Sequence, residues 1–72
     1  MNEKHNFNFV YTVIPCDNNI LYSVCCLDEN GRKIKAIDAV GEKDVTENFC
    51  KFLNEGKIHP CHFEDIYEDY FG

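Results

Sequence analysis

The end of the chain, residues 58–71, has the pattern of a short amphipathic helix. Apolar residues recur there at intervals of three and four, which places them on one helical face. They are Phe63, Ile66, Tyr67, Tyr70 and Phe71. The positions between them are all acidic, namely Glu64, Asp65, Glu68 and Asp69. Pro60 suits the first helical turn, because the N–H that proline lacks would be unpaired there. We expect the aromatic stripe to anchor this helix while the acids face solvent.

The first half of the chain predicts three antiparallel strands. Residues 7–14 alternate an aromatic face with a second face, and Pro15 ends that strand. Residues 20–27 are apolar on both sides, as expected of a central strand. A turn at residues 28–32 leads into a third strand that runs to about Val40.

That turn allows two registers. A two-residue turn at Asn30 and Gly31 sets Cys26 against Lys35, whereas a type I turn with a bulge at Gly31 sets Cys26 against Ile34. We choose the second, because a slip of one residue would turn the lysines of the third strand toward the core. The inner face then comprises Ile20, Tyr22, Val24, Cys26, Ile34, Ala36 and Val40, with Val24 opposite Ala36 and with Asp38 near the strand's end. The outer face comprises Val10, Ile14, Leu21, Leu27 and Ile37 among Thr12, Ser23, Cys25, Lys33 and Lys35.

Another helix is expected before the closing one. Asp44 suits its N-cap with Glu47 as capping-box partner, and Gly56 suits its C-cap. Its apolar stripe comprises Val45, Phe49, Phe52 and Leu53. Three strands followed by two helices imply one α+β domain over residues 1–72, a three-stranded antiparallel meander with both helices packed on one face. We expect Phe49, Phe52, Phe63 and Ile66 to pack against Phe9, Tyr22 and Val24.

Charge is unevenly distributed along the chain. The formal net charge is -6, and residues 58–72 contain four acids and no Lys or Arg, so two thirds of the net charge lies on the closing segment. Direct nucleic-acid binding needs clustered Lys and Arg, so a chain with this acidic balance is a poor candidate for it. A protein partner with a basic surface fits better. No apolar run approaches the ~18 residues of a membrane span.

The cysteines indicate a reducing compartment. There are five, at Cys16, Cys25, Cys26, Cys50 and Cys61. An odd number, together with a polar start to the chain where a signal peptide would be apolar, predicts free thiols in the cytoplasm.

The candidates for metal binding are His59, Cys61 and His62. Two histidines three residues apart can share one side of a helix, and Cys61 adds a thiolate. A structural zinc site needs four ligands, however, and the sequence contains no Cys-x-x-Cys pair. His62 equally suits a packed or capping position at a helix start. We assign no metal and no cofactor, and keep a small metal- or redox-responsive sensor as the alternative function.

The acidic face predicts docking more than catalysis. The chain has no Gly-rich phosphate loop and no Gly-x-Ser-x-Gly elbow, and we expect it not to be an enzyme. Like charges four residues apart repel, and Glu68 and Asp69 lie near the negative end of the helix dipole. This cost in stability favours a docking role, although a solvated helix face has the same spacing. The expected partner-binding residues are Glu64, Asp65, Tyr67, Glu68, Asp69 and Tyr70.

Two helices leave one face of the sheet uncovered. The apolar side chains on that face, or the open edge of the strand that begins at Phe7, therefore predict a homodimer.

The tail carries a specific motif. Leu-Asn is followed by a short linker and then by Pro-x-His-hydrophobic-x-Asp-hydrophobic-x-x-Asp-aromatic. The matching residues are Leu53, Asn54, Pro60, His62, Phe63, Asp65, Ile66, Asp69 and Tyr70. On these residues the chain resembles a family of small uncharacterised proteins from clostridia and related Firmicutes. That family has no known catalytic residues, so the resemblance implies no chemistry.

In length and general character, the chain is also similar to small directionality factors of large serine recombinases. The resemblance is to a factor whose recombinase excises a prophage-like element that interrupts a sporulation sigma-factor gene. Such factors bind the recombinase and redirect its synapsis without catalysing a reaction. The resemblance implies a small non-enzymatic protein-interaction factor, most concretely a recombination directionality factor.

Overall fold

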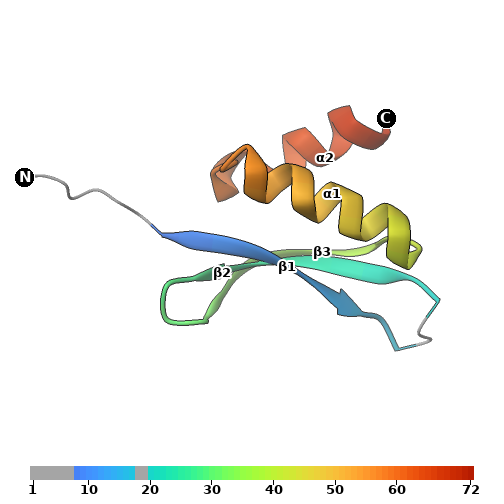
Figure 1. The fold of residues 1–72 in the computed structure, drawn as a ribbon, viewed down its shortest axis with the longest axis horizontal. Helices are drawn as coiled ribbons and strands as arrows, with labels where there is room; N and C mark the ends of the chain where they lie inside the picture. The colour runs from blue at the N-terminus through green and yellow to red at the C-terminus, as the bar shows by residue number, and fades with distance from the viewer. Residues whose placement is uncertain (1–7, 18–19) are drawn as a thin grey trace, which may run out of the picture.

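The computed structural model describes residues 8–17 and 20–72 and arranges them in two layers (Figure 1). Antiparallel strands β1 (Phe9–Pro15), β2 (Tyr22–Asp28) and β3 (Lys33–Gly41) form a sheet in the order β1-β2-β3. Helix α1 (Lys43–Glu55), the single turn η2 (Pro60–His62) and helix α2 (Phe63–Phe71) follow. Both helices lie on the same side of the sheet. The α+β arrangement predicted from the sequence is therefore confirmed, while Phe7 lies outside the described residues.

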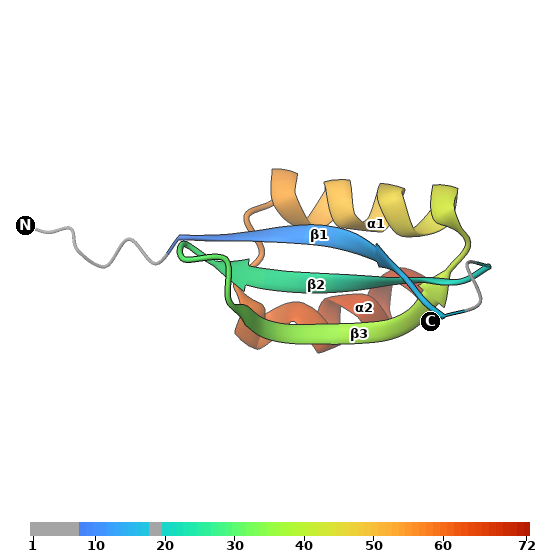
Figure 2. The same cartoon turned by 90° about the horizontal axis from the view of Figure 1, so that it is seen from below.

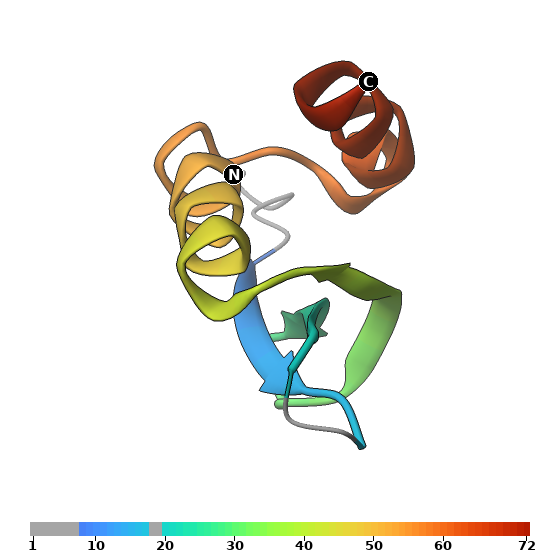
Figure 3. The ribbon, with the colours of Figure 1, turned by 90° about the vertical axis from the view of Figure 1, so that its right-hand side faces the viewer.

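The two helices cover different parts of the inner side of the sheet. Figure 2 and Figure 3 show α1 along the side of β1, and α2 returning in the opposite direction over β3. No helix from the described part of the chain covers the other face of the sheet. We call that face the outer face, and the face beneath the helices the inner face.

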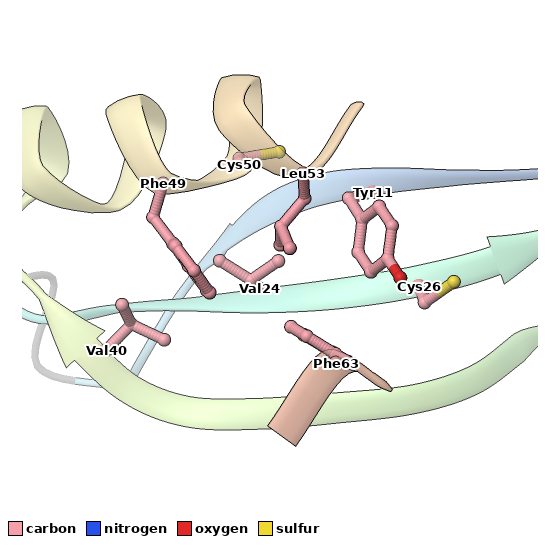
Figure 4. Packing of buried hydrophobic residues seen from close by; sticks show 8 residues of the cluster. All are labelled: Tyr11, Val24, Cys26, Val40, Phe49, Cys50, Leu53 and Phe63. Carbon is pink, nitrogen blue, oxygen red and sulfur yellow. The ribbon is translucent and has the colours of Figure 1, made fainter. Parts of the chain in front are cut away.

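The core lies between the inner face and α1 and is closed by one residue of α2 (Figure 4). Its buried members are Tyr11, Val24, Cys26, Val40, Phe49, Cys50, Leu53 and Phe63. The rings of Phe49 and Phe63 stack with centroids 6.4 Å apart, and Tyr11 meets Phe63 edge-on at 5.0 Å. Phe63 is the buried residue of α2, so this ring seats the helix on the rest of the molecule.

Two residues of the apolar stripe expected on α1 lie at the surface, namely Val45, which is 41% exposed, and Phe52. Phe52 is 44% exposed and contacts Tyr70, with ring centroids 5.2 Å apart. The next residue, Leu53, is fully buried and takes the place on α1 that faces the sheet. The prediction that Phe52 packs into the core was wrong, because the apolar stripe of α1 is wider than the surface available to cover it.

The hairpin between β2 and β3 has the expected turn but not the expected register. Gly31 adopts a positive φ of 82°, and its N–H donates to Asp28, as in a type I turn with a bulge. A further irregularity after Leu27 then shifts the pairing by one residue, so that Cys26 lies opposite Lys35. Val24 lies opposite Ile37 and Cys25 opposite Ala36.

This shift reverses the predicted faces of residues 35–38 of β3, whereas Lys33 and Val40 keep theirs. Lys35 and Ile37 lie on the inner face, whereas Ala36 and Asp38 lie on the outer face. Ile34 is 39% exposed and is not a core residue. The predicted register was chosen to keep lysine away from the core. At a sheet edge, however, Lys35 reaches past the core, and its Nζ lies 3.8 Å from a carboxylate oxygen of Glu64.

The second strand also starts later than expected. It begins at Tyr22, and Ile20 is 64% exposed, so Ile20 is not an inner-face residue.

The N-terminal cap of α1 also differs from the prediction. Glu42 occupies the N-cap without a side-chain bond, and Asp44 lies inside the first turn, so the predicted capping box does not form. The predicted C-cap at Gly56 is confirmed.

The edge of β1 is closed by a side chain from α1. Asn54 accepts a hydrogen bond from the Tyr11 N–H at 2.8 Å and donates one to the Tyr11 carbonyl at 3.0 Å. The Tyr11 hydroxyl donates to the Ile58 carbonyl at 2.6 Å. The middle of this edge is therefore occupied, contrary to the open edge that the sequence suggested for dimerisation.

We expect Phe49→Ala and Phe52→Ala to differ sharply in stability. Removal of the buried Phe49 ring should lower the free energy of unfolding by about 3–5 kcal/mol. Removal of the exposed Phe52 ring should cost about 1 kcal/mol, since it loses one aromatic contact. Urea unfolding of both variants measures the difference. Equal costs would contradict the position of Leu53 and Phe52 on α1.

We expect Asn54→Ala to destabilise the fold by about 1–3 kcal/mol, because both backbone groups of Tyr11 lose their partners. Asn48→Ala is the matched control, since Asn48 is an exposed residue of the same helix. It should change the free energy of unfolding by less than about 0.5 kcal/mol. Hydrogen exchange at the Tyr11 amide should accelerate only in the first variant. Two indistinguishable variants would show that Asn54 does not hold the edge.

Candidate functional site

The acidic residues of α2 lie on its outward side. Glu64, Asp65, Glu68 and Asp69 are all exposed, as the sequence predicted. Glu64 pairs with Lys35 at 3.8 Å, but both side chains remain largely in water, so the pair contributes little to stability. The other three acids form no ion pair within the described residues. They leave a concentrated negative charge along the helix, and we call these four residues the acidic face.

Exposed aromatic rings gather where α1 and α2 meet. Phe52 and Tyr70 have centroids 5.2 Å apart, and Tyr70 and Phe71 have centroids 4.9 Å apart. Phe52 and Tyr70 are each 44% exposed, and Phe71 is 40% exposed. The buried ring of Phe49 lies within 5.0 Å of Tyr70 and 5.2 Å of Phe71, so the exposed rings rest on the core. We call Phe52, Tyr70 and Phe71 the aromatic seam.

The two tyrosines predicted to bind a partner have different surroundings. Tyr67 is half-buried, and its ring packs against Phe49 at 5.8 Å, so much of it serves the fold. Tyr70 presents nearly half of its surface to solvent and is the better anchor. Phe52 was missed as a surface residue. The exposure of Phe52 could have been inferred from the width of the apolar stripe on α1. That stripe is wider than the helix surface that can pack against the sheet.

The acidic face and the aromatic seam adjoin each other on α2. Asp69 directly precedes Tyr70, and Glu68 lies three residues before Phe71. Protein interfaces commonly have an apolar aromatic centre and a polar rim. This side of the molecule has both parts of such an interface on one short helix.

The residues predicted as candidate metal ligands, His59, Cys61 and His62, do not form a metal site with other described residues, and His59 caps η2. His59 is the N-cap of η2, and its Nδ1 accepts a hydrogen bond from the Cys61 N–H at 3.1 Å. Its ring also meets Phe9 edge-on at 5.7 Å. Cys61 and His62 are exposed. Within residues 8–17 and 20–72, no group of three or more His, Cys, Asp or Glu side chains is arranged to hold a metal ion.

The cysteines are unpaired and mostly buried. Cys25, Cys26 and Cys50 are buried, Cys16 is half-buried and Cys61 is exposed. Burial raises the pKa of the Cys25, Cys26 and Cys50 thiols, because the thiolate form is disfavoured away from water. Burial likewise raises the pKa of the Tyr11 hydroxyl well above its ordinary value, and the adjacent Cys26 adds to that shift.

The outer face carries a second apolar surface with a hollow of about 370 Å³. Ser23 lies in that hollow, donates a hydrogen bond to Asp38 at 3.3 Å, and contacts the Cys16 thiol at 3.2 Å. Asp38, which the predicted register placed on the inner face, therefore lies at the surface of the outer face. The exposed apolar residues around this face are Val10, Ile14, Ile20 and Ile34.

Comparison with known proteins adds no family assignment. No protein-family model, no curated protein and no solved structure matches this chain. The resemblances drawn from the tail motif and from chain length therefore stay predictions. In the part of the chain that the structure describes, no helix is long and apolar enough to cross a membrane.

We expect stability to fall on the alkaline side. Each buried thiol has a higher pKa in the folded state than in the unfolded state, so the folded state holds its proton more tightly. Stability is then constant below the ordinary thiol pKa of about 8.5 and decreases as the pH rises above it. Urea unfolding across this range measures the slope.

Two variants separate the buried thiols from the exposed one. Cys26→Ala should make the alkaline slope shallower, whereas Cys61→Ser should leave it unchanged because Cys61 is exposed. An equal slope in the Cys26→Ala variant and the unmodified protein would refute this assignment.

Proposed function

We propose that this chain is a non-enzymatic, cytoplasmic protein-interaction factor that binds a basic surface of its partner through α2. One observation carries the proposal: on α2 the exposed acidic face adjoins Tyr70 and Phe71, the two rings that this helix contributes to the aromatic seam. Four solvated carboxylates attract a basic surface, and exposed rings provide the area that such a contact buries. Solvated carboxylates also suit docking better than acid–base chemistry, which uses carboxyl groups in altered environments.

The two parts of this surface have different roles in binding. Charge at a rim mainly speeds encounter and sets register, because long-range attraction acts before contact. A buried aromatic anchor supplies most of the affinity and governs dissociation. We assign the first role to Glu64, Asp65, Glu68 and Asp69, and the second chiefly to Tyr70, with the half-buried Tyr67 contributing a smaller exposed area.

The concrete form of the proposal is a recombination directionality factor. Its partner would be a large serine recombinase, which it would redirect toward excision without contacting DNA through a basic patch of its own. The similarity in length and character supports this form, as does the acidic charge of the chain. A DNA-binding enzyme presents basic surfaces to which an acidic factor can dock.

The double variant Glu68→Lys and Asp69→Lys tests the surface. The fold should be intact or slightly more stable, because the change removes repulsion near the negative end of α2. Association with the purified recombinase should slow by about tenfold or more at low salt, and association of the unmodified protein should slow as salt rises. Stopped-flow association at two ionic strengths measures both effects, and excision assays measure the consequence for recombination.

The matched control places the same change in net charge at the start of α1, with Glu42→Lys at the N-cap and Glu47→Lys within the helix. Both residues are exposed and lie outside the acidic face. This control should associate nearly as fast as the unmodified protein. If both double variants bind and promote excision normally, and if association is independent of salt, the acidic face only solubilises the protein and the proposal fails.

A further inference from the structure

β3 is the edge of the sheet that remains open. The opposite edge is occupied at Tyr11, whose N–H and carbonyl both bond the Asn54 side chain. β3 is the last strand of the sheet, and no described element lies alongside it on the far side. An edge of this kind presents backbone donors and acceptors that another strand can use.

The direction of the amide groups on β3 follows from Tyr11. The backbone groups of Tyr11 point away from β2, and in an antiparallel sheet this direction alternates along each strand. Cys26, opposite Tyr11, therefore directs its groups toward its β3 partner Lys35, and Lys35 directs its groups back. The next residue, Ala36, directs its N–H and carbonyl outward, away from the sheet. Asp38 follows with the same orientation.

The acidic face lies above this open edge. α2 runs over β3, as both the view from the outer face and the end view show (Figure 2 and Figure 3). The contact of 3.8 Å between Lys35 and Glu64 fixes the side of α2 that carries Glu64 above the edge strand. Glu68 lies one helical turn further on the same side. A strand placed beside β3 would therefore run beneath these carboxylates.

We propose that the open edge of β3 receives a short extended segment of the partner in which Lys or Arg occupies alternate positions. This inference rests on the proposed function and names the kind of segment that the acidic face selects. The segment would add a fourth strand through the backbone groups of Ala36 and Asp38. Because strand side chains alternate between faces, every second residue would point toward Glu64 and Glu68.

The same charges disfavour a second copy of this chain at the edge. Two β3 strands paired about a two-fold axis would bring two α2 helices together across that axis. The acidic face of each helix would then meet an identical acidic face, and like charges would repel. Irregularities in the pairing with β2 also flank the regular stretch of β3, at Leu27 and between Tyr22 and Val24. Such bulges limit nonspecific strand pairing, so the charge of the incoming segment decides whether it binds.

A labelled peptide of alternating Lys and Val is the probe. It should bind the full-length protein in fluorescence anisotropy, and the Ala36 amide should become protected from hydrogen exchange in the complex. A peptide of alternating Glu and Val should not bind. A helix-forming peptide with the same number of lysines should leave the Ala36 amide exchanging as in the free protein. If the helix-forming peptide binds as tightly and the Ala36 amide is unprotected with both, strand addition is wrong.

Two substitutions at one position sharpen the test. Ala36→Pro removes the outward N–H without removing a bond to β2, and it should weaken peptide binding by about tenfold. Ala36→Thr keeps the N–H and should bind within about twofold of the unmodified protein. Equal binding by the two variants would overturn the proposal. If Ala36→Pro does not fold, exchange protection of the Ala36 amide in the unmodified protein decides.

The outcomes separate this inference from the function on which it rests. Salt-dependent binding of the recombinase by the unmodified protein, with no protection at Ala36, would overturn strand addition and leave the docking function intact. Salt-independent recombinase binding would overturn both. Concentration-dependent protection of Ala36 in the protein alone would show that a second copy occupies the edge, and would also overturn the proposal.

Discussion

The position of α2 depends chiefly on the burial of one ring, that of Phe63, with Ile66 and Tyr67 packed at the margin of the same core. A nine-residue helix is not stable alone in water, because the cost of nucleation exceeds what so few hydrogen bonds return. Phe63 is fully buried against Tyr11 and Phe49, and it therefore holds α2 on the sheet by its first turn. The His59 cap and Pro60 set the approach of the chain to that ring. The position of the acidic face consequently follows from a contact at the opposite side of the same helix.

Tyr11 connects this layer to the sheet in three ways. Its ring packs on Phe63, its hydroxyl bonds the carbonyl of Ile58 in the connection between the helices, and its backbone bonds Asn54. One residue thus positions the end of α1, the linker and the start of α2. Because its backbone also faces away from β2, the same residue closes one edge of the sheet and fixes which amides of β3 remain open.

The sequence was sufficient for the order of the elements and for the orientation of α2. The spacing of Phe63 and the four acids allows only one rotation of the helix about its axis, with Phe63 toward the core and the acids toward solvent. The register of β3 could not be obtained in the same way, since it depends on where Lys35 can place its ammonium group. That position is acceptable because Lys35 lies at the sheet edge, where its ammonium group reaches solvent and lies 3.8 Å from Glu64, a residue 29 positions away. Phe52 was misplaced for a related reason, because its spacing matches that of the core residues and only the limited cover provided by α2 leaves it exposed.

The stability of α2 and its availability for binding are physically linked. The acidic face places four like charges on one short helix, and the aromatic seam leaves apolar rings in water, so both features raise the free energy of the unbound helix. The acidic face adds nothing to the core, which Phe63 closes with Ile66 and Tyr67 packed against it. A basic partner would neutralise the charges and cover the rings at the same time. Relief of the charge repulsion and burial of the rings would then both lower the free energy of the complex. Opening of α2 should therefore be suppressed more strongly by the partner than opening of β2 or α1, whose buried residues already supply their stability. α2, a nine-residue helix that is not stable alone in water, therefore gains stability when a partner covers it.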